Sequence, residues 1–227
     1  DYGKFYIQET TEYMRQSLKV WAELGFSFDV VSTGMILSAE QAALVSDFCE
    51  QSAKKGALVF VDPIMGDEGK LYNGVGEETV AHMRKMVAVA DCIVPNYTEA
   101  AYLADMPYHE DMTEEEARAL TIRLHEMGAK SVVVTSAKVD GDDCVVGYDG
   151  TEGEFFRIPF DLIPVRFVGT GDIFAAVMLG RLVDGVPLQE STHRAMDAVR
   201  TMIDRNRDKE DKYLGIPIET CLEVLDE

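Results

Sequence analysis

FVGTGDIFAA, residues 167–176, joins a predicted strand to a predicted helix and is the most informative stretch of the chain. Gly169 and Gly171 allow the backbone to turn tightly and to approach an anion closely. The helix that follows directs its unpaired N–H groups and the positive end of its dipole at whatever occupies the turn. We therefore expect an anion-binding loop in which Asp172 can accept a proton from a substrate hydroxyl. The plainer interpretation is a helix start with glycines for turning and an aspartate as its cap.

Apolar strands alternate with helices outward from this loop. Residues 57–62 (ALVFVD) are near-continuously apolar, as strands buried on both faces require. Other strands are expected at 28–33, 92–94 and 131–135, with hairpin strands within 144–167 around an Asp149-Gly150 turn. Helices are expected at 10–24, 38–55, 77–90, 113–127, 172–184 and 188–205. This order predicts an α/β fold with a mostly parallel central sheet and helices on both faces, in one domain spanning residues 1–227.

In parallel sheets, ligands bind beyond the carboxyl ends of the strands, so we look for chemistry in those loops. Asp62 and Asp67 leave the end of one strand in a glycine-rich loop that can move as a flap. Their carboxylates suit Mg²⁺, which keeps several waters and bridges to substrate phosphates. Asn96 and Glu99 follow the next strand, where they can share one face of a helix start and hold a metal-bound water.

Thr135 and Ser136 end a further predicted strand, and hydroxyls there can bind phosphate or ribose oxygens. Taken alone, each of these loops is equally compatible with helix capping or an ordinary solvated turn. The sequence contains no G-x-S-x-G elbow, Walker A loop or Rossmann G-x-G-x-x-G. Its four cysteines lack zinc-binding spacing, and we expect its four histidines at the surface.

The charge balance restricts the classes of partner. Twenty-one basic residues against 41 acidic residues give a formal net charge of −20. Nucleic acids and anionic membranes are bound by basic faces, so neither is an expected partner. Scattered thiols and a polar opening at residues 1–4 suit a cytoplasmic protein. A nucleotide substrate would need local positive potential from backbone N–H groups and a bound Mg²⁺.

Together, these loops resemble the ribokinase-like superfamily and, within it, the pyridoxal kinases. The resemblance covers nearly the whole chain in order. Its motifs are residues 28–34 (FDVVSTG), 62–67 (DPIMGD), 94–100 (VPNYTEA), 134–136 (VTS) and 167–176 (FVGTGDIFAA). It implies a ribokinase-like three-layer sandwich and an ATP-dependent kinase. The expected reaction is phosphorylation of the 5′-hydroxymethyl group of pyridoxal, pyridoxine or pyridoxamine.

The resemblance also implies roles for the residues of the anion loop. Asp172 matches the catalytic base that takes the proton of the 5′-hydroxymethyl group. The N–H groups of Gly169, Thr170 and Gly171 match the anion hole for the γ-phosphoryl group. Val168 and the helix after Leu188 match positions near the adenine.

Metal and nucleotide positions follow from the resemblance in the same way. Asp67 and Glu99 match positions near Mg²⁺, often acting through water, and a monovalent cation is a further candidate cofactor. Residues that match the lining of the ATP phosphates, or the flap over them, are Asp62, Tyr72, Asn96, Thr135 and Ser136. The family further implies a homodimer.

Two features depart from the family. The tyrosine that usually follows Thr-Gly in the 28–34 motif, where its ring stacks on the pyridine, is Met35 here, and a thioether can still pack on a ring. The family's first ~50–60 residues, judged by typical strand-helix-strand lengths, have no counterpart within residues 1–227. Because this N-terminal strand-helix region carries a core strand, we expect a preceding segment or a partner chain to fill the gap.

Three other functions remain open at this stage. Hydroxymethylpyrimidine kinases share the fold but usually carry cysteine at the position of Asp172. Sugar and nucleoside kinases usually carry alanine at the position of Thr170. The third is a catalytically impaired, ATP-binding relative, which a test of phosphate transfer to a vitamer would distinguish from an enzyme.

Overall fold

The computed structural model describes residue 6 and residues 8–225, so the polar opening at residues 1–4 lies outside the described residues. The α-helices are α1 (Thr11–Glu23), α2 (Ala39–Ala53), α3 (Glu77–Val87), α4 (Tyr97–Ala104), α5 (Glu114–Glu126), α6 (Thr170–Val183) and α7 (Leu188–Asn206). Two short 3₁₀ helices, η1 (Ile218–Thr220) and η2 (Leu222–Leu225), follow α7. No helix of the described residues combines the length and the apolar composition needed to span a membrane.

A six-stranded sheet forms the centre of the fold. Its strands, in spatial order, are β1 (Val30–Thr33), β2 (Leu58–Val61), β5 (Cys92–Ile93), β6 (Ser131–Val139), β7 (Asp142–Asp149) and β8 (Glu154–Pro159). The first four strands pair in parallel, and β7 and β8 add antiparallel ribbons at one edge. A separate two-stranded hairpin, β3 (Gly66–Asp67) and β4 (Lys70–Leu71), lies beyond the end of β2. The predicted parallel arrangement is confirmed.

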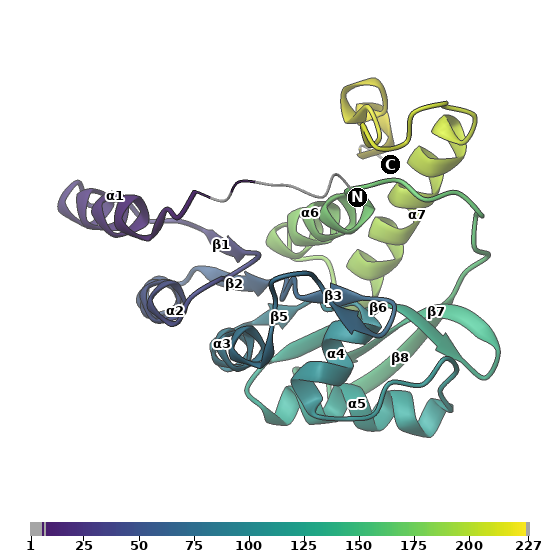
Figure 1. The fold of residues 1–227 in the computed structure, drawn as a ribbon, viewed down its shortest axis with the longest axis horizontal. Coiled ribbons are helices and arrows are strands. Elements are labelled where there is room, and N and C mark those ends of the chain that lie inside the picture. Colours follow the sequence, from purple (N-terminus) through teal and green to yellow (C-terminus); the bar gives the residue numbers. More distant parts are fainter. Residues whose placement is uncertain (1–5, 7, 226–227) are drawn as a thin grey trace.

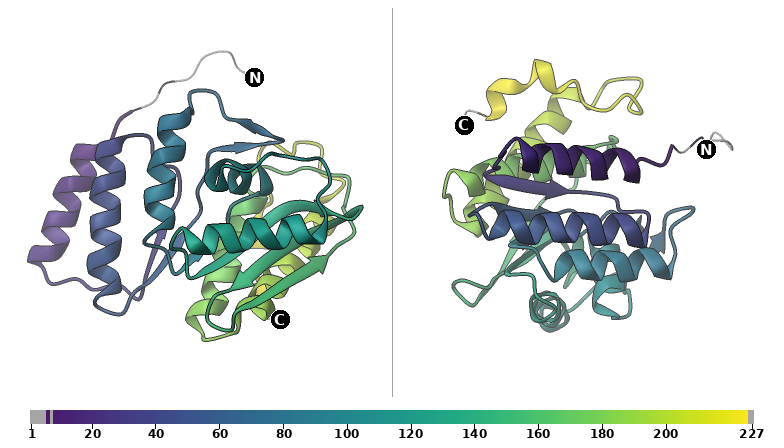
Figure 2. Two further views of the ribbon diagram at one scale, coloured as in Figure 1. Left: turned by 90° about the horizontal axis from the view of Figure 1, so that it is seen from below. Right: turned by 90° about the vertical axis from the view of Figure 1, so that its left-hand side faces the viewer.

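Helices cover both faces of this sheet, as predicted. Helices α2, α3, α4 and α5 lie on one face, and α6 and α7 lie on the other (Figure 1). Helix α1 packs beside α2 near the β1 edge, and Figure 2 shows α1, α2 and α3 in a nearly parallel row. The result is a three-layer α/β sandwich.

Alternating side chains on the central strands supply both cores. Val59 and Val61 on β2 pack toward α2 and α3, whereas Phe60 packs toward α6 and α7, and all three are fully buried. Successive side chains of a strand point to opposite faces, so a strand covered on both faces must be apolar at every position. This explains the uninterrupted apolar run that the sequence shows at residues 57–61.

The expected hairpin around Asp149-Gly150 is confirmed, because Asp149 at the end of β7 pairs with Glu154 at the start of β8. Two other local predictions were wrong. Strand β6 does not end at Thr135 but continues to Val139, with an irregularity between Val134 and Ala137. An Asp140-Gly141 turn, with φ of 50° and 87°, starts the antiparallel strand that pairs with this extension. His82 is buried rather than at the surface, among the buried residues of α3.

Phe60 tests the core between the sheet and helices α6 and α7. We expect Phe60→Ala to lower the free energy of unfolding by about 3–5 kcal/mol, because a large buried ring is replaced by a cavity. Urea denaturation followed by circular dichroism measures the change. Phe26→Ala is the matched control, since Phe26 is half exposed; equal losses for the two variants would contradict this account of the core.

Candidate active site at the carboxyl edge of the sheet

The loops singled out in the sequence meet at one edge of the sheet. The N–H of Asp62 donates to the carbonyl of Thr33 (3.0 Å), which joins the loops after β2 and β1. Asn96 and Thr135 form an isolated parallel bridge, which joins the loop after β5 to the middle of β6. The charge of Asp172 acts on Asp62, so the start of α6 lies within electrostatic range of the same loops.

The start of α6 forms an open turn. Gly169 precedes the helix with a φ of 86°, in the left-handed region that favours glycine, and no side chain caps the helix. The first N–H groups of a helix have no intrahelical acceptor, so those of this first turn are available to an anion. The carboxylate of Asp172 lies back over the turn, because its Oδ2 is 3.7 Å from where a Cβ on Gly169 would stand.

Asp62 is a partly buried carboxyl group that directly follows β2 at this edge. Burial raises the pKa of Asp62 from its ordinary value of 3.8 to about 7, and the negative charge of Asp172 adds to the rise. Two carboxylates that repel each other in this way bind cations readily, because a positive charge relieves the repulsion.

Glu99 is almost completely buried, with 3% of its surface exposed. Its Oε1 accepts hydrogen bonds from the N–H groups of Met65 (3.0 Å) and Gly66 (3.5 Å), and its Oε2 accepts one from Asn96 (2.8 Å). The Asn96 side chain accepts in return from the N–H of Glu99, which completes a capping box at the start of α4. Burial raises the pKa of Glu99 to about 7 against the opposing effect of these hydrogen bonds. The predicted helix-capping pair therefore also fixes the backbone that leads into the β3–β4 hairpin.

The β3–β4 hairpin is the predicted glycine-rich flap. Its turn consists of Glu68 and Gly69, with φ of 51° and 76°, the signs of the tight turns that suit hairpins. The Nδ2 of Asn96 donates to the carbonyl of Gly66 (2.8 Å), and the N–H of Gly69 donates to Oγ1 of Thr98 (2.8 Å). The hairpin is thus held along one side by the first turn of α4.

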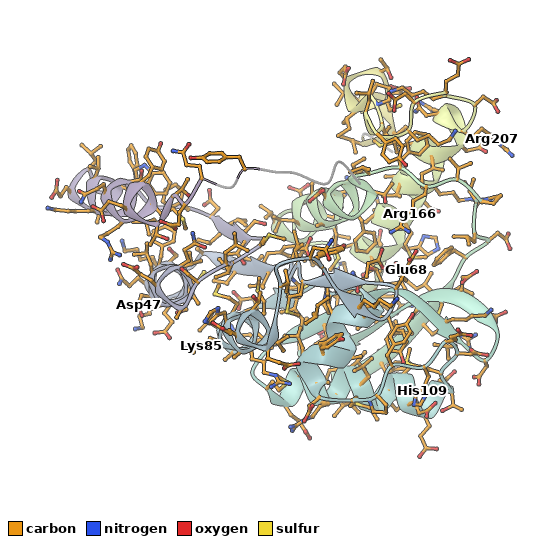
Figure 3. The ribbon with its side chains drawn as sticks, in the orientation of Figure 1. Asp47, Glu68, Lys85, His109, Arg166 and Arg207 are labelled. Atoms are coloured by element: carbon orange, nitrogen blue, oxygen red, sulfur yellow. The ribbon has the colours of Figure 1, made fainter. Side chains whose placement is uncertain are left out.

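Arg166 meets the other side of the hairpin. Its Nη2 lies 2.5 Å from Oδ2 of Asp67, and its Nη1 lies 2.6 Å from Oε1 of Glu68. Arg166 and Glu68 lie next to each other beside the start of α6 (Figure 3). Burial is the main cause that raises the pKa of the Tyr72 phenol, and the negative charges of Asp67 and Glu99 raise it further. The phenol therefore lies near the acidic groups of the site.

The remaining predicted residues lie around this cluster. Thr135 is half-buried next to Asn96, whereas Ser136 is exposed at the irregular point of β6, with a φ of 55°. Val168 is 62% exposed, and its carbonyl contacts the loop at Gly215. Ser136 and Val168 are therefore both accessible to a ligand.

The donor set fits a hydrated divalent cation rather than an all-protein metal cage. Within the described residues, no three histidine, cysteine, aspartate or glutamate side chains gather as a metal site. Asp67 nevertheless holds a cation, the guanidinium of Arg166, and carboxylate oxygens are the ligands that Mg²⁺ prefers. Mg²⁺ commonly uses one or two carboxylates and completes its shell with waters and phosphate oxygens. Asp67, with Glu99 behind it, fits that pattern.

Two cavities lie at opposite ends of the strands, and one of them is near the carboxyl edge. One of about 400 Å³ lies against α1 and the loop after β1 and is lined by Glu9, Met14, Met35 and Gln41. Another of about 520 Å³ lies among Leu58, Asp91, Lys130 and Asp149, near the opposite ends of the strands. Ligands of open α/β sheets bind at the carboxyl ends of strands, so the smaller cavity is the one related to the site.

Sequence reasoning missed Arg166 and Thr98. Arg166 directly precedes the FVGTGD loop, and a lone basic residue beside an anion motif was the signal that could have found it. Thr98 lies inside the NYTEA motif, but its contact with the hairpin depends on tertiary structure.

The fold and this edge define the chain as a ribokinase-like α/β protein. It belongs to the phosphomethylpyrimidine kinase family, whose sequence model matches residues 7–215. The pyridoxal kinase of Arabidopsis thaliana is 33% identical over 171 residues, which cover 72% of this chain and 53% of that protein. The chain spans about half the length of the curated relatives it matches. The resemblance to pyridoxal kinases stated above is confirmed.

Solved structures agree with this assignment. A Bacteroides thetaiotaomicron protein, provisionally assigned as a phosphomethylpyrimidine kinase and crystallised with pyridoxal, is 32% identical with a TM-score of 0.92. The match covers 100% of this chain and 80% of that one. Pyridoxal kinase from Lactobacillus plantarum is 27% identical with a TM-score of 0.85, and the match covers 100% of this chain and 81% of that one.

The raised pKa of Asp62 predicts a dependence of stability on pH. The carboxyl group of Asp62 ionises near pH 4 in the unfolded state but only near pH 7 in the folded state. The folded state therefore binds more protons in this window, and its stability falls as pH rises through it. We expect Asp62→Asn to remove at least about 1 kcal/mol of this fall between pH 4.5 and pH 7.5.

Urea denaturation at several pH values without divalent metal measures the slope. Asp47→Asn is the control, because Asp47 is exposed on α2. If Asp62→Asn and Asp47→Asn show the same dependence on pH, the carboxyl group of Asp62 does not carry the effect.

Proposed function

We propose that this protein transfers the γ-phosphoryl group of ATP to the 5′-hydroxymethyl group of pyridoxal, pyridoxine or pyridoxamine. The observation that carries the proposal is the uncapped start of α6, where Asp172 lies over an anion-sized turn beside the carboxylate of Asp62. The relatives named pyridoxal kinase and the related structure crystallised with pyridoxal support the choice of substrate.

In the proposed reaction, the hydroxyl oxygen of the vitamer attacks the γ-phosphorus, and the bond from that phosphorus to the β,γ-bridging oxygen breaks. Asp172 accepts the hydroxyl proton, and ADP leaves with the bridging oxygen. The N–H groups of Gly169, Thr170 and Gly171 stabilise the charge on the transferring group. Phosphoryl transfer needs mostly positioning and charge stabilisation, and a helix start supplies both.

Nucleotide binding is proposed at the adjacent loops. Asp67 and Glu99 would hold Mg²⁺, directly or through water, and the ion would offset phosphate charge that a protein of net charge −20 otherwise repels. The phosphates and the flap over them are contacted by Asp62, Tyr72, Asn96, Thr135 and Ser136. Val168, largely exposed beside the start of α6, packs against the adenine. A monovalent cation is a further proposed cofactor, as in the family that the sequence resembles, and it would relieve the repulsion between the carboxylates of Asp62 and Asp172.

The vitamer is proposed to enter from the side of the cavity of about 400 Å³. Met35 is 44% exposed there, so its thioether can pack on the pyridine ring. We further propose that residues 1–227 act as one domain, in a cytoplasmic homodimer, as in the family that the sequence resembles.

A hydroxymethylpyrimidine kinase is the second candidate, because the family model that matches the chain is that of phosphomethylpyrimidine kinase. An aspartate at position 172, where those kinases usually carry cysteine, favours the vitamer. An ATP-binding relative without catalysis is the third candidate, and a single assay of phosphate transfer separates it from the other two.

The role of Asp172 is tested by Asp172→Asn. We expect kcat for pyridoxal to fall by about 10²–10⁴, the range for loss of a general base, with ATP affinity within about threefold of the unchanged protein. A coupled assay of ADP release gives kcat, and calorimetry gives the affinity. Asp184→Asn at the far end of α6 is the control. A near-normal kcat in Asp172→Asn would remove this residue from the mechanism.

The substrate is tested by direct competition. With ATP and Mg²⁺ present, we expect kcat/KM for pyridoxal to exceed that for hydroxymethylpyrimidine by at least about tenfold, a difference of ~1.4 kcal/mol. Mass spectrometry of the phosphorylated products measures both rates in one mixture. Faster turnover of the pyrimidine would reverse the assignment, and no turnover of either substrate would favour the non-catalytic relative.

A further inference from the structure

The guanidinium of Arg166 forms a two-pronged contact with the hairpin. One nitrogen lies 2.5 Å from the carboxylate of Asp67 and the other lies 2.6 Å from that of Glu68. The two acidic residues, Glu68 first, also raise the pKa of Arg166, so its guanidinium stays charged. Asp67 is at the same time the carboxylate that best fits Mg²⁺ in this site.

This contact contributes little to the fold. The Arg166 side chain is 73% exposed, and exposed ion pairs add little to stability. The hairpin is already held by a hydrogen bond from Asn96 and by one that Gly69 donates to Thr98. The backbone under Arg166 is fixed, because the next residue, Phe167, is 3% exposed. Asp67 and the base of Arg166 are therefore fixed in place, while the guanidinium between them is free to move through water.

A guanidinium and a divalent cation compete for one carboxylate. The oxygen of Asp67 that faces Arg166 already accepts a charged donor, and its other oxygen accepts from the N–H of Glu68 (2.9 Å). An inner-sphere metal needs one of these oxygens and is also repelled by a positive charge nearby. Glu68 offers Arg166 a second partner, so the guanidinium can leave Asp67 without losing its contact with the hairpin.

We propose that Arg166 is a positioning residue that pairs with Asp67 in the metal-free protein and yields it to the divalent metal that enters with the nucleotide. This inference rests on the proposed function and adds to it an internal cation that sets metal affinity. Without metal, Arg166 offsets the charge of the acidic cluster. When the metal binds, Asp67 changes partners, and Arg166 stays with Glu68 at the edge of the nucleotide site.

Mn²⁺ binding without nucleotide or vitamer tests the competition, with the free ion counted by electron paramagnetic resonance. We expect Arg166→Gln to bind Mn²⁺ about three- to tenfold more tightly than the unchanged protein, since a competing charge is removed. Arg166→Lys, which keeps the charge but loses the two-pronged geometry, is expected to lie between them. Arg207→Gln is the matched control, because Arg207 is an exposed arginine at the end of α7, far from the hairpin (Figure 3).

A second comparison separates competition from a general charge effect. In an Asp67→Asn background, we expect Arg166→Gln to change Mn²⁺ affinity by less than about twofold, because the contested carboxylate is gone. If Arg166→Gln raises Mn²⁺ affinity in the Asp67→Asn background as much as it does in the unchanged protein, the proposal is overturned. So does an affinity in Arg166→Gln that is equal to or weaker than that of the unchanged protein, including undetectable binding in both. Weaker ATP binding with unchanged Mn²⁺ affinity would make Arg166 a phosphate contact instead.

These measurements are independent of phosphoryl transfer. Failure of the proposed function would appear as absence of turnover in every variant, while the Mn²⁺ result would stand or fall separately. Thermal melting of Arg166→Gln and Arg207→Gln checks the fold, and we expect the two midpoints to agree within about 2 °C, because both arginines form exposed ion pairs.

Discussion

The buried carboxylate of Glu99 joins the parts on which the site depends. Its three hydrogen bonds connect the cap of α4 to the backbone of Met65 and Gly66, which leads into the β3–β4 hairpin. Leaving a buried acceptor and these donors unpaired would cost more than the bonds contribute, so the arrangement is held as a unit. The position of Asp67, and hence of any cation bound there, follows from this one side chain and its partners.

If this strongly acidic protein binds ATP as proposed, it has to obtain positive potential locally. The site provides it in two forms, the uncapped first turn of α6 and the guanidinium of Arg166 beside Asp67. The backbone contribution is permanent because it is built into the helix. The guanidinium sits on an exposed side chain, and in the proposal above it changes partners when a metal enters. The carboxylates of Asp62 and Asp172 add negative charge that a bound cation must offset.

Much of the fold and the location of the site were predictable because parallel sheets follow strong rules. Apolar runs such as residues 57–61 have to be buried on both faces, and loops that follow parallel strands meet at one edge. The capping box of Asn96 and Glu99 was readable from their spacing. The extension of β6 to Val139 was missed although Asp140-Gly141 is typical of a hairpin turn, because polar residues at 136 and 138 interrupt the apolar run.

The amino-acid order alone therefore determined the layered α/β architecture and predicted the glycine turn at 169–172 and the acidic loops around it, since these depend on local periodicity and on turn chemistry. The tertiary structure was needed for the pairing of Arg166 with Asp67, which are 99 positions apart, and for the contact of Thr98 with Gly69. It was also needed for the burial that raises the pKa of Asp62 and Glu99. Burial and long-range charge depend on which elements pack together, and no local pattern encodes those distances.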